Sequence, residues 1–205
     1  MRFRTIAVAA GAASMALAAS LALAGCAPTD GSTSGMDSDM MNSTPEASAE
    51  FNAVDEMFVT MMIPHHEQAI EMADALLAKE DIDDRVVTLA EQIEAAQAPE
   101  IETMKGWLED WGIPVDDSMS DSMEGMDHGD GMMGAADMDE LEAATGADAT
   151  RLFLEGMIVH HEGALHMAEV VLDGGQNPDV AALAQQIVDG QTAEISQMKQ
   201  ILESL

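Results

Sequence analysis

The segment that decides the fold is Phe58–Ala73, FVTMMIPHHEQAIEMA, because the chain repeats it 95 positions later as Phe153–Ala168, FLEGMIVHHEGALHMA. In each copy a Phe, a Met, the first His of a pair, an Ala and a second Met follow at steps of four, three, four and three residues. At about 3.6 residues per turn these positions share one face of a helix. Each copy therefore predicts a helix whose interior face carries a histidine between two methionines.

A second pair of matching segments follows the first pair, at an offset of 94 positions. The matching residues are Leu89, Gln92, Ile93, Gln97, Glu100, Ile101, Met104, Lys105 and Leu108, which recur as Leu183, Gln186, Ile187, Gln191, Glu194, Ile195, Met198, Lys199 and Leu202. Helix-breaking Gly, Pro and Asn combinations separate the segments, so helices are predicted at 50–79, 82–111, 147–172 and 178–205. The predicted fold is all-α: a four-helix bundle in a duplicated domain at 50–205, built from two repeated helical hairpins at 50–112 and 147–205.

The residues between the hairpins, 113–146, are predicted to be a Met- and Asp-rich linker. A long connection without apolar periodicity is usually functional or disordered. Methionines among Asp, Ser and Gly have no predicted core to pack into, so they are interpreted as metal ligands. A compositionally biased linker or an oxidant-scavenging methionine tract is the alternative. This group consists of Met119, Met123, Met126, Met132 and Met133, together with His128.

The N-terminus has the pattern of an export signal. Arg2 and Arg4 precede an uncharged stretch rich in Ala, which ends in Leu-Ala-Gly before Cys26. This pattern predicts a signal peptide at 1–25, and its end resembles the bacterial lipoprotein motif, which implies a lipid-modified Cys26. A disordered, flexible tether is predicted at 26–49. The expected location is outside the cell, lipid-anchored at the outer face of the cytoplasmic membrane or in the periplasm; an uncleaved transmembrane helix is the alternative.

The charge of the chain is strongly negative, with 39 Asp and Glu against 7 Lys and Arg and a formal net charge of −32. Such a surface repels nucleic acid and anionic lipid and concentrates cations. Nucleic acid is therefore excluded as a partner. The charge alone does not separate a cation-collecting role from a well-solvated acidic surface.

Copper is the metal that best fits the donors of the predicted bundle. Imidazole suits copper in either oxidation state as well as zinc or iron, whereas thioether sulfur favours Cu(I). A His and Met set without a free Cys thus favours Cu(I), and Cu(II) is compatible with it. The predicted ligands are Met62, His65, His66, Met72, Met157, His160, His161, His166 and Met167. The alternative is a structural core, since helical Met is normally core filler and a buried His is normally a hydrogen-bonded one.

The motif resembles the family called domain of unknown function 305, whose signature is Met-x-x-His-His-x-x-Ala-x-x-Met-Ala. It occurs here as Met62–Ala73 and again as Met157–Ala168. The resemblance implies a ferritin-like helical bundle and, from some relatives, periplasmic copper binding and resistance. A copper-handling protein is then a candidate partner, and the sequence gives no indication of oligomeric state.

Enzymatic activity is not expected. The Glu-x-x-His motif of ferritin-like di-iron sites is absent from both repeats, and His161-Glu162 lies one residue too far from His166 for a zinc-protease motif. A structural or interaction bundle that grips a partner through its methionines stays open as the second functional class, with a metal-dependent enzyme as the third.

Overall fold

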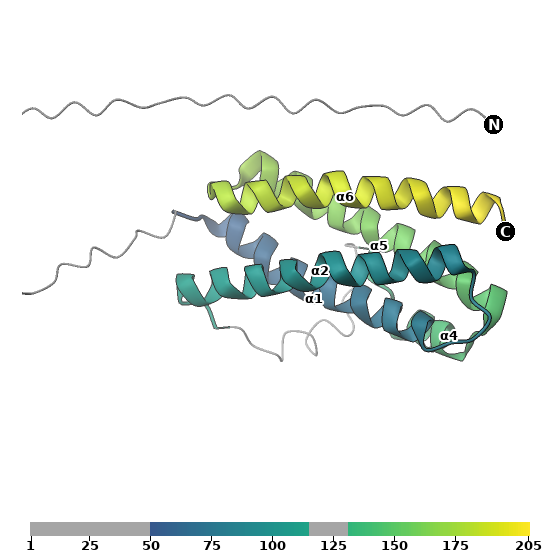
Figure 1. The fold of residues 1–205 in the computed structure, drawn as a ribbon. Coiled ribbons are helices and arrows are strands. Elements are labelled where there is room, and N and C mark those ends of the chain that lie inside the picture. Colours follow the sequence, from purple (N-terminus) through teal and green to yellow (C-terminus); the bar gives the residue numbers. More distant parts are fainter. Residues whose placement is uncertain (1–49, 115–130) are drawn as a thin grey trace, which may run out of the picture. The chain divides into compact units, whose positions relative to one another are not determined.

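The computed structural model describes residues 50–114 and 131–205, which form five α-helices and no strand (Figure 1). The predicted signal peptide, the tether and Cys26 lie outside the described residues, and so do four of the predicted linker ligands, namely Met119, Met123, Met126 and His128. Within the described ranges, no helix combines the length and apolar character needed to cross a bilayer.

Four long helices make the bundle, and one short helix joins it. Helices α1 (Ala53–Leu77) and α2 (Asp84–Trp111) form one hairpin, and α5 (Gly146–Gly174) and α6 (Pro178–Glu203) form the other. Helices α1 and α5 also pack against each other. The all-α prediction of a four-helix bundle from two repeated hairpins is confirmed, with helix ends a few residues from those expected.

Helix α4 (Ala135–Ala143) corrects the prediction that 113–146 is wholly a linker. Its Leu141 is fully buried and its Met138 nearly so. Two apolar residues one turn apart are enough to seat a nine-residue helix on the bundle, although they are too few for a recognisable sequence period. The methionine-rich connection therefore ends in a packed segment.

The start of α1 is held by a capping box that also fixes the opposite hairpin. The Asn52 side chain accepts hydrogen bonds from the backbone N–H groups of Val54 and Asp55, and the Asp55 carboxylate accepts from the Asn52 N–H at 2.8 Å. Buried Asp55 also accepts from the N–H groups of Gln176 and Asn177 in the α5–α6 turn. One carboxylate thereby ties the beginning of α1 to the turn of the other hairpin.

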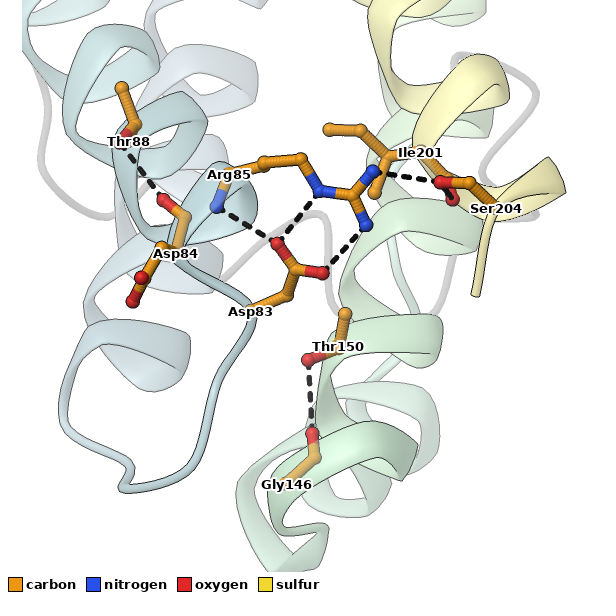
Figure 2. A network of polar contacts seen from close by, with 8 residues as sticks. All are labelled: Asp83, Asp84, Arg85, Thr88, Gly146, Thr150, Ile201 and Ser204. Carbon is orange, nitrogen blue, oxygen red and sulfur yellow. Dashed lines mark hydrogen bonds and ion pairs between the residues drawn. The ribbon is translucent and has the colours of Figure 1, made fainter.

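The other end of the bundle has its own polar tie (Figure 2). Asp83 caps α2 and pairs with Arg85, whose guanidinium also donates to the Ser204 hydroxyl beyond α6 at 2.7 Å. Hydrogen bonds from the Arg85 side chain lower the pKa of Asp83 to about 2. The two hairpins are thus connected by polar contacts at both ends of the bundle.

The apolar core consists of two clusters, one toward each end of the bundle. One cluster combines the C-terminal half of α1 with the N-terminal half of α5, and the other combines the N-terminal half of α1 with the C-terminal half of α5. Helices α1 and α5 therefore run antiparallel, as two repeats related by a pseudo-twofold axis require. Both α1 and α2 continue through an internal proline, Pro64 and Pro99 respectively.

Candidate metal centre

Four buried histidines form a polar layer between the two apolar clusters. His66, His160 and His161 are fully buried, and His65 is 1% exposed. The prediction that His65 and His160 face inward is confirmed. His66 and His161, which sequence periodicity places only at the border of the interior face, are buried because α1 and α5 each contact two other helices of the bundle.

The first histidines of the two repeats meet at the centre of this layer. The ring centroids of His65 and His160 are 3.7 Å apart, with the ring planes inclined by 40°. Within each pair the neighbouring rings are more distant, at 6.5 Å for His65 and His66 and 6.3 Å for His160 and His161. The antiparallel packing of α1 on α5 therefore brings together imidazoles that are 95 residues apart in the sequence.

The second histidine of each pair is held by a glutamate on the partner helix. His66 Nε2 lies 2.8 Å from Glu100 Oε2, and His161 Nε2 lies 2.7 Å from Glu194 Oε2. Because a carboxylate only accepts hydrogen bonds, Nε2 carries the hydrogen and Nδ1 of the neutral ring carries the lone pair. Both Nδ1 atoms are buried and have no hydrogen-bond partner among the described residues. Carboxylate–histidine pairs of this kind orient imidazoles that bind metals.

The interior of the layer favours neutral imidazole. Burial, together with the neighbouring rings of His65, His161 and His66, holds the pKa of His160 well below its ordinary value near 6.5. Neither ring nitrogen of His160 has a hydrogen-bond partner among the described residues. A neutral ring with a free lone pair is the form that ligates a metal.

Two buried glutamines lie one helical turn before the glutamates that bind His66 and His161. Gln97 of α2 and Gln191 of α6 occupy matching positions in the two repeats and are both buried. Both amide atoms of Gln97 and the amide oxygen of Gln191 have no hydrogen-bond partner among the described residues. Leaving so many buried polar atoms unsatisfied is costly, so the layer is suited to a bound ion or bound water.

Thioethers adjoin the layer on both sides. Met62 and Met167 belong to one apolar cluster, and Met157 and Met72 belong to the other. In each repeat the buried first histidine therefore lies between two buried thioether sulfurs along the same helix face. Packing alone also accounts for these methionines, because each of them fills the core.

The donor set decides which metals fit. Among the described residues, no three His, Asp or Glu side chains are grouped so that they could hold one metal ion. A closed site of hard or borderline ligands, as for structural zinc, is therefore not supported. A site that combines imidazole with thioether sulfur does fit the residues present, and that combination favours copper.

The remaining predicted ligands lie away from the layer. His166 is exposed and lines a groove between α1 and α5. Met132 and Met133 are half-buried beside α5, and the Gln68 side chain holds the backbone of Met133 through two hydrogen bonds, of 2.9 and 2.7 Å. The structure thus separates the predicted ligands into a central layer and two outer groups.

Sequence reasoning missed the roles of Gln97, Glu100, Gln191 and Glu194. The available signal was the repetition of polar residues at matching places in α2 and α6, at an interval that puts them opposite the histidine pairs. Two further ion pairs repeat in the same way, Lys105 with Glu67 at 2.7 Å and Lys199 with Glu162 at 3.1 Å. Polar residues that repeat at matching positions therefore indicate both the buried contacts with the histidines and the ion pairs on the surface nearby.

Solved structures of similar sequence share this fold. A DUF305 fragment from Deinococcus radiodurans is 33% identical, with a TM-score of 0.67 over 75% of this chain and 98% of that chain. A DUF305 protein from Streptomyces coelicolor, described as secreted, is 32% identical, with a TM-score of 0.65 over 74% of this chain and 93% of that chain. No curated protein sequence is a significant match.

CopM is a third similar protein, with solved structures in copper-bound, silver-bound and apo forms. Its Cu(II)-bound form is 34% identical, with a TM-score of 0.63 over 73% of this chain and 96% of that chain. Its Cu(I)-bound form is 33% identical over the same coverage, with a TM-score of 0.59. The model of the domain of unknown function DUF305 matches residues 55–202. The chain therefore belongs to the DUF305 family.

Proposed function

We propose that this protein binds copper, preferentially Cu(I), in the histidine layer and serves as an exported store or carrier of the ion. Copper is the cargo in this proposal, and the protein performs no reaction on it. The copper-bound and silver-bound structures of one relative, CopM, support a metal-related role. The binding residues are proposed from the geometry of this chain.

The observation that carries the proposal is the pair of histidine–glutamate contacts facing one buried layer. Glu100 and Glu194 each bind Nε2 of a histidine, and the Nδ1 atoms of both rings are buried without a hydrogen-bond partner among the described residues. We expect one ion to take at most two nitrogen donors, from among the imidazoles of His66, His160 and His161. Met62 or Met157 is expected to supply sulfur. Glutamates that are about one-fifth exposed hold the rings in place from outside the layer.

Burial favours the monovalent ion. A divalent cation loses far more solvation than a monovalent one on entering an apolar interior. Among the described residues, no carboxylate is buried beside the four histidines at the centre of the layer to compensate. Neutral imidazole and thioether are uncharged donors suited to Cu(I). The depressed pKa of His160 keeps its ring in the neutral form.

A Cu(I) titration of the full chain against a competing chelator tests this function. The matched variant lacks residues 116–130 and so loses Met119, Met123, Met126 and His128, while the packed segment from Gly131 onward stays. Wild type and variant are both expected to retain a tight site. Loss of all measurable Cu(I) binding in the variant would show that the histidine layer is structural.

Export and lipid anchoring are a separate part of the proposal and rest on the N-terminal pattern before Cys26. A diacyl modification supplies two chains, where a single chain gives only marginal membrane binding. Replacing Cys26 with Ser is expected to move the protein from the membrane fraction to the soluble fraction. A variant that still pellets with membranes after an alkaline wash would indicate an uncleaved membrane helix.

A further inference from the structure

A groove on the surface of the bundle gathers donors that the histidine layer does not use. It lies between the N-terminal half of α1 and the C-terminal half of α5 and has a volume of about 240 Å³. Its lining includes Met57, Met61, His166, Met167 and Val170. Two thioethers from α1 and one imidazole from α5 therefore border the same space, and a third thioether, that of Met167, adjoins them.

Core packing does not account for Met57. Met57 is 50% exposed, and it lies one helical turn before Met61, so both side chains fall on the same side of α1. His166 is exposed as well. Exposed Met and His that share one groove are accessible to a dissolved ion, in contrast to the buried layer.

The pseudo-equivalent groove at the other end of α1 and α5 lacks these donors. Leu152 stands in place of Met57, Gly156 in place of Met61, and Glu71 in place of His166. The chain covers this second groove itself: a Cβ added to Gly156 would lie 2.9 Å from the Met133 sulfur. The covered groove thus lacks counterparts of Met57, Met61 and His166, which the open groove carries in addition to Met167.

We propose that Met57, Met61 and His166 form a second, solvent-accessible site for a soft monovalent cation such as Cu(I). The choice of metal rests on the proposed function. Two thioethers and a neutral imidazole are donors that Cu(I) accepts and that hard cations do not favour. Met167 lines the groove and also belongs to the apolar cluster that contains Met62, so the groove adjoins the side of the bundle that leads to the histidine layer.

The test uses Ag(I), an air-stable monovalent probe, and the full chain labelled with ¹³C at the methionine methyl groups. On titration, the methyl resonances of Met57 and Met61 are expected to shift and saturate. The Met57→Leu/Met61→Leu variant is expected to bind one equivalent less Ag(I) in a competition titration. The control Val170→Leu changes the apolar rim of the same groove without removing a donor, and it is expected to bind as wild type does.

The outcomes separate this site from the histidine layer. If the Met62 and Met157 resonances respond while those of Met57 and Met61 stay fixed, the groove site is overturned and the proposed function stands. If only the groove resonances respond, the groove site is supported and the proposed binding in the layer fails. A Met57→Leu/Met61→Leu variant with unchanged Ag(I) stoichiometry would also overturn the groove site, and would leave the surface as an apolar contact for another protein.

Discussion

In both hairpins the second histidine bonds a glutamate of the partner helix, His66 with Glu100 and His161 with Glu194, at 2.8 and 2.7 Å. Beside that layer the hairpins differ, since half-buried Gln68 in α1 is matched by buried Gly163 in α5. The interior has to satisfy packing and buried polar groups at once, so both repeats keep the same residues there. The surface has no such constraint. There the Gln68 side chain holds the backbone of Met133, whereas the groove beside Met57 and His166 stays open.

Removing the second histidine of each pair, His66 and His161, is expected to have the largest effect on Cu(I) binding. Replacing both His66 and His161 with Leu should lower the Cu(I) affinity of the tight site by more than roughly 100-fold, because direct ligands contribute more than the outer partners whose loss costs 10- to 100-fold. The measurement is a chelator competition on variants whose helicity is checked by circular dichroism. His166→Asn, which alters a histidine outside the layer, should leave this tight site intact. An unchanged Cu(I) affinity in the double variant would show that the histidine layer is not the tight site.

A smaller effect is expected from the glutamates that orient the rings. Glu100→Gln with Glu194→Gln should weaken Cu(I) binding by roughly 10- to 100-fold, since an amide no longer forces the hydrogen onto Nε2. Glu67→Gln is the matched control, because Glu67 pairs with Lys105 on the surface of the same hairpin. Equal losses in the control and the double variant would mean that the effect is general electrostatics and not ring orientation.

The pH dependence of stability sharpens the comparison further. Unfolded His160 titrates near 6.5, whereas the folded pKa lies well below that value, so the unfolded state binds more protons between the two values. The contribution of neutral His160 to the free energy of unfolding is complete above pH 6.5. It is lost as the pH falls below 6.5, at about 1.4 kcal/mol per pH unit for one proton. Urea unfolding of the metal-free chain between pH 7.5 and 5 measures this, for wild type and for His160→Gln. Parallel stability curves for the two proteins would contradict the buried neutral ring.

The smallest effect is expected on local stability, from removing the hydrogen bonds between Gln68 and the backbone of Met133. Gln68→Ala removes both hydrogen bonds to the backbone of half-buried Met133 and should cost about 1 kcal/mol locally. Hydrogen exchange at the Met133 amide should accelerate while exchange in α1 and α5 stays unchanged. The matched position in the other repeat is Gly163, which offers no side chain for such a clamp, so unchanged exchange at Met133 would show that the segment is held by apolar packing alone.

Much of the fold follows from the sequence because it depends on repeated periodicity. The steps from Phe58 to Met72 place one face of α1 in the interior, and the same steps place α5 there. Helix α4 was missed because Met138 and Leu141 become buried only through the surface that the other helices provide. No local pattern contains that information.

The site was predictable in part, for the same reason. The histidine pairs are visible as a repeated motif, and the inward orientation of His65 and His160 follows from periodicity. The burial of His66 and His161 depends on how the helices pack against one another, and so do their contacts with Glu100 and Glu194. The periodicity of a single helix does not specify this packing. The open groove depends on the same crossing, since it brings Met57 and Met61 beside His166.

Nitrogen NMR of the imidazole rings tests the central claim most directly. The full chain, labelled with ¹⁵N at histidine, is loaded anaerobically with Cu(I) to one equivalent. We predict that the Nδ1 resonances of His66 and His161 shift on loading while their Nε2 atoms keep their hydrogens toward Glu100 and Glu194. Unchanged Nδ1 resonances at both histidines, with one equivalent of copper bound by competition titration, would contradict it.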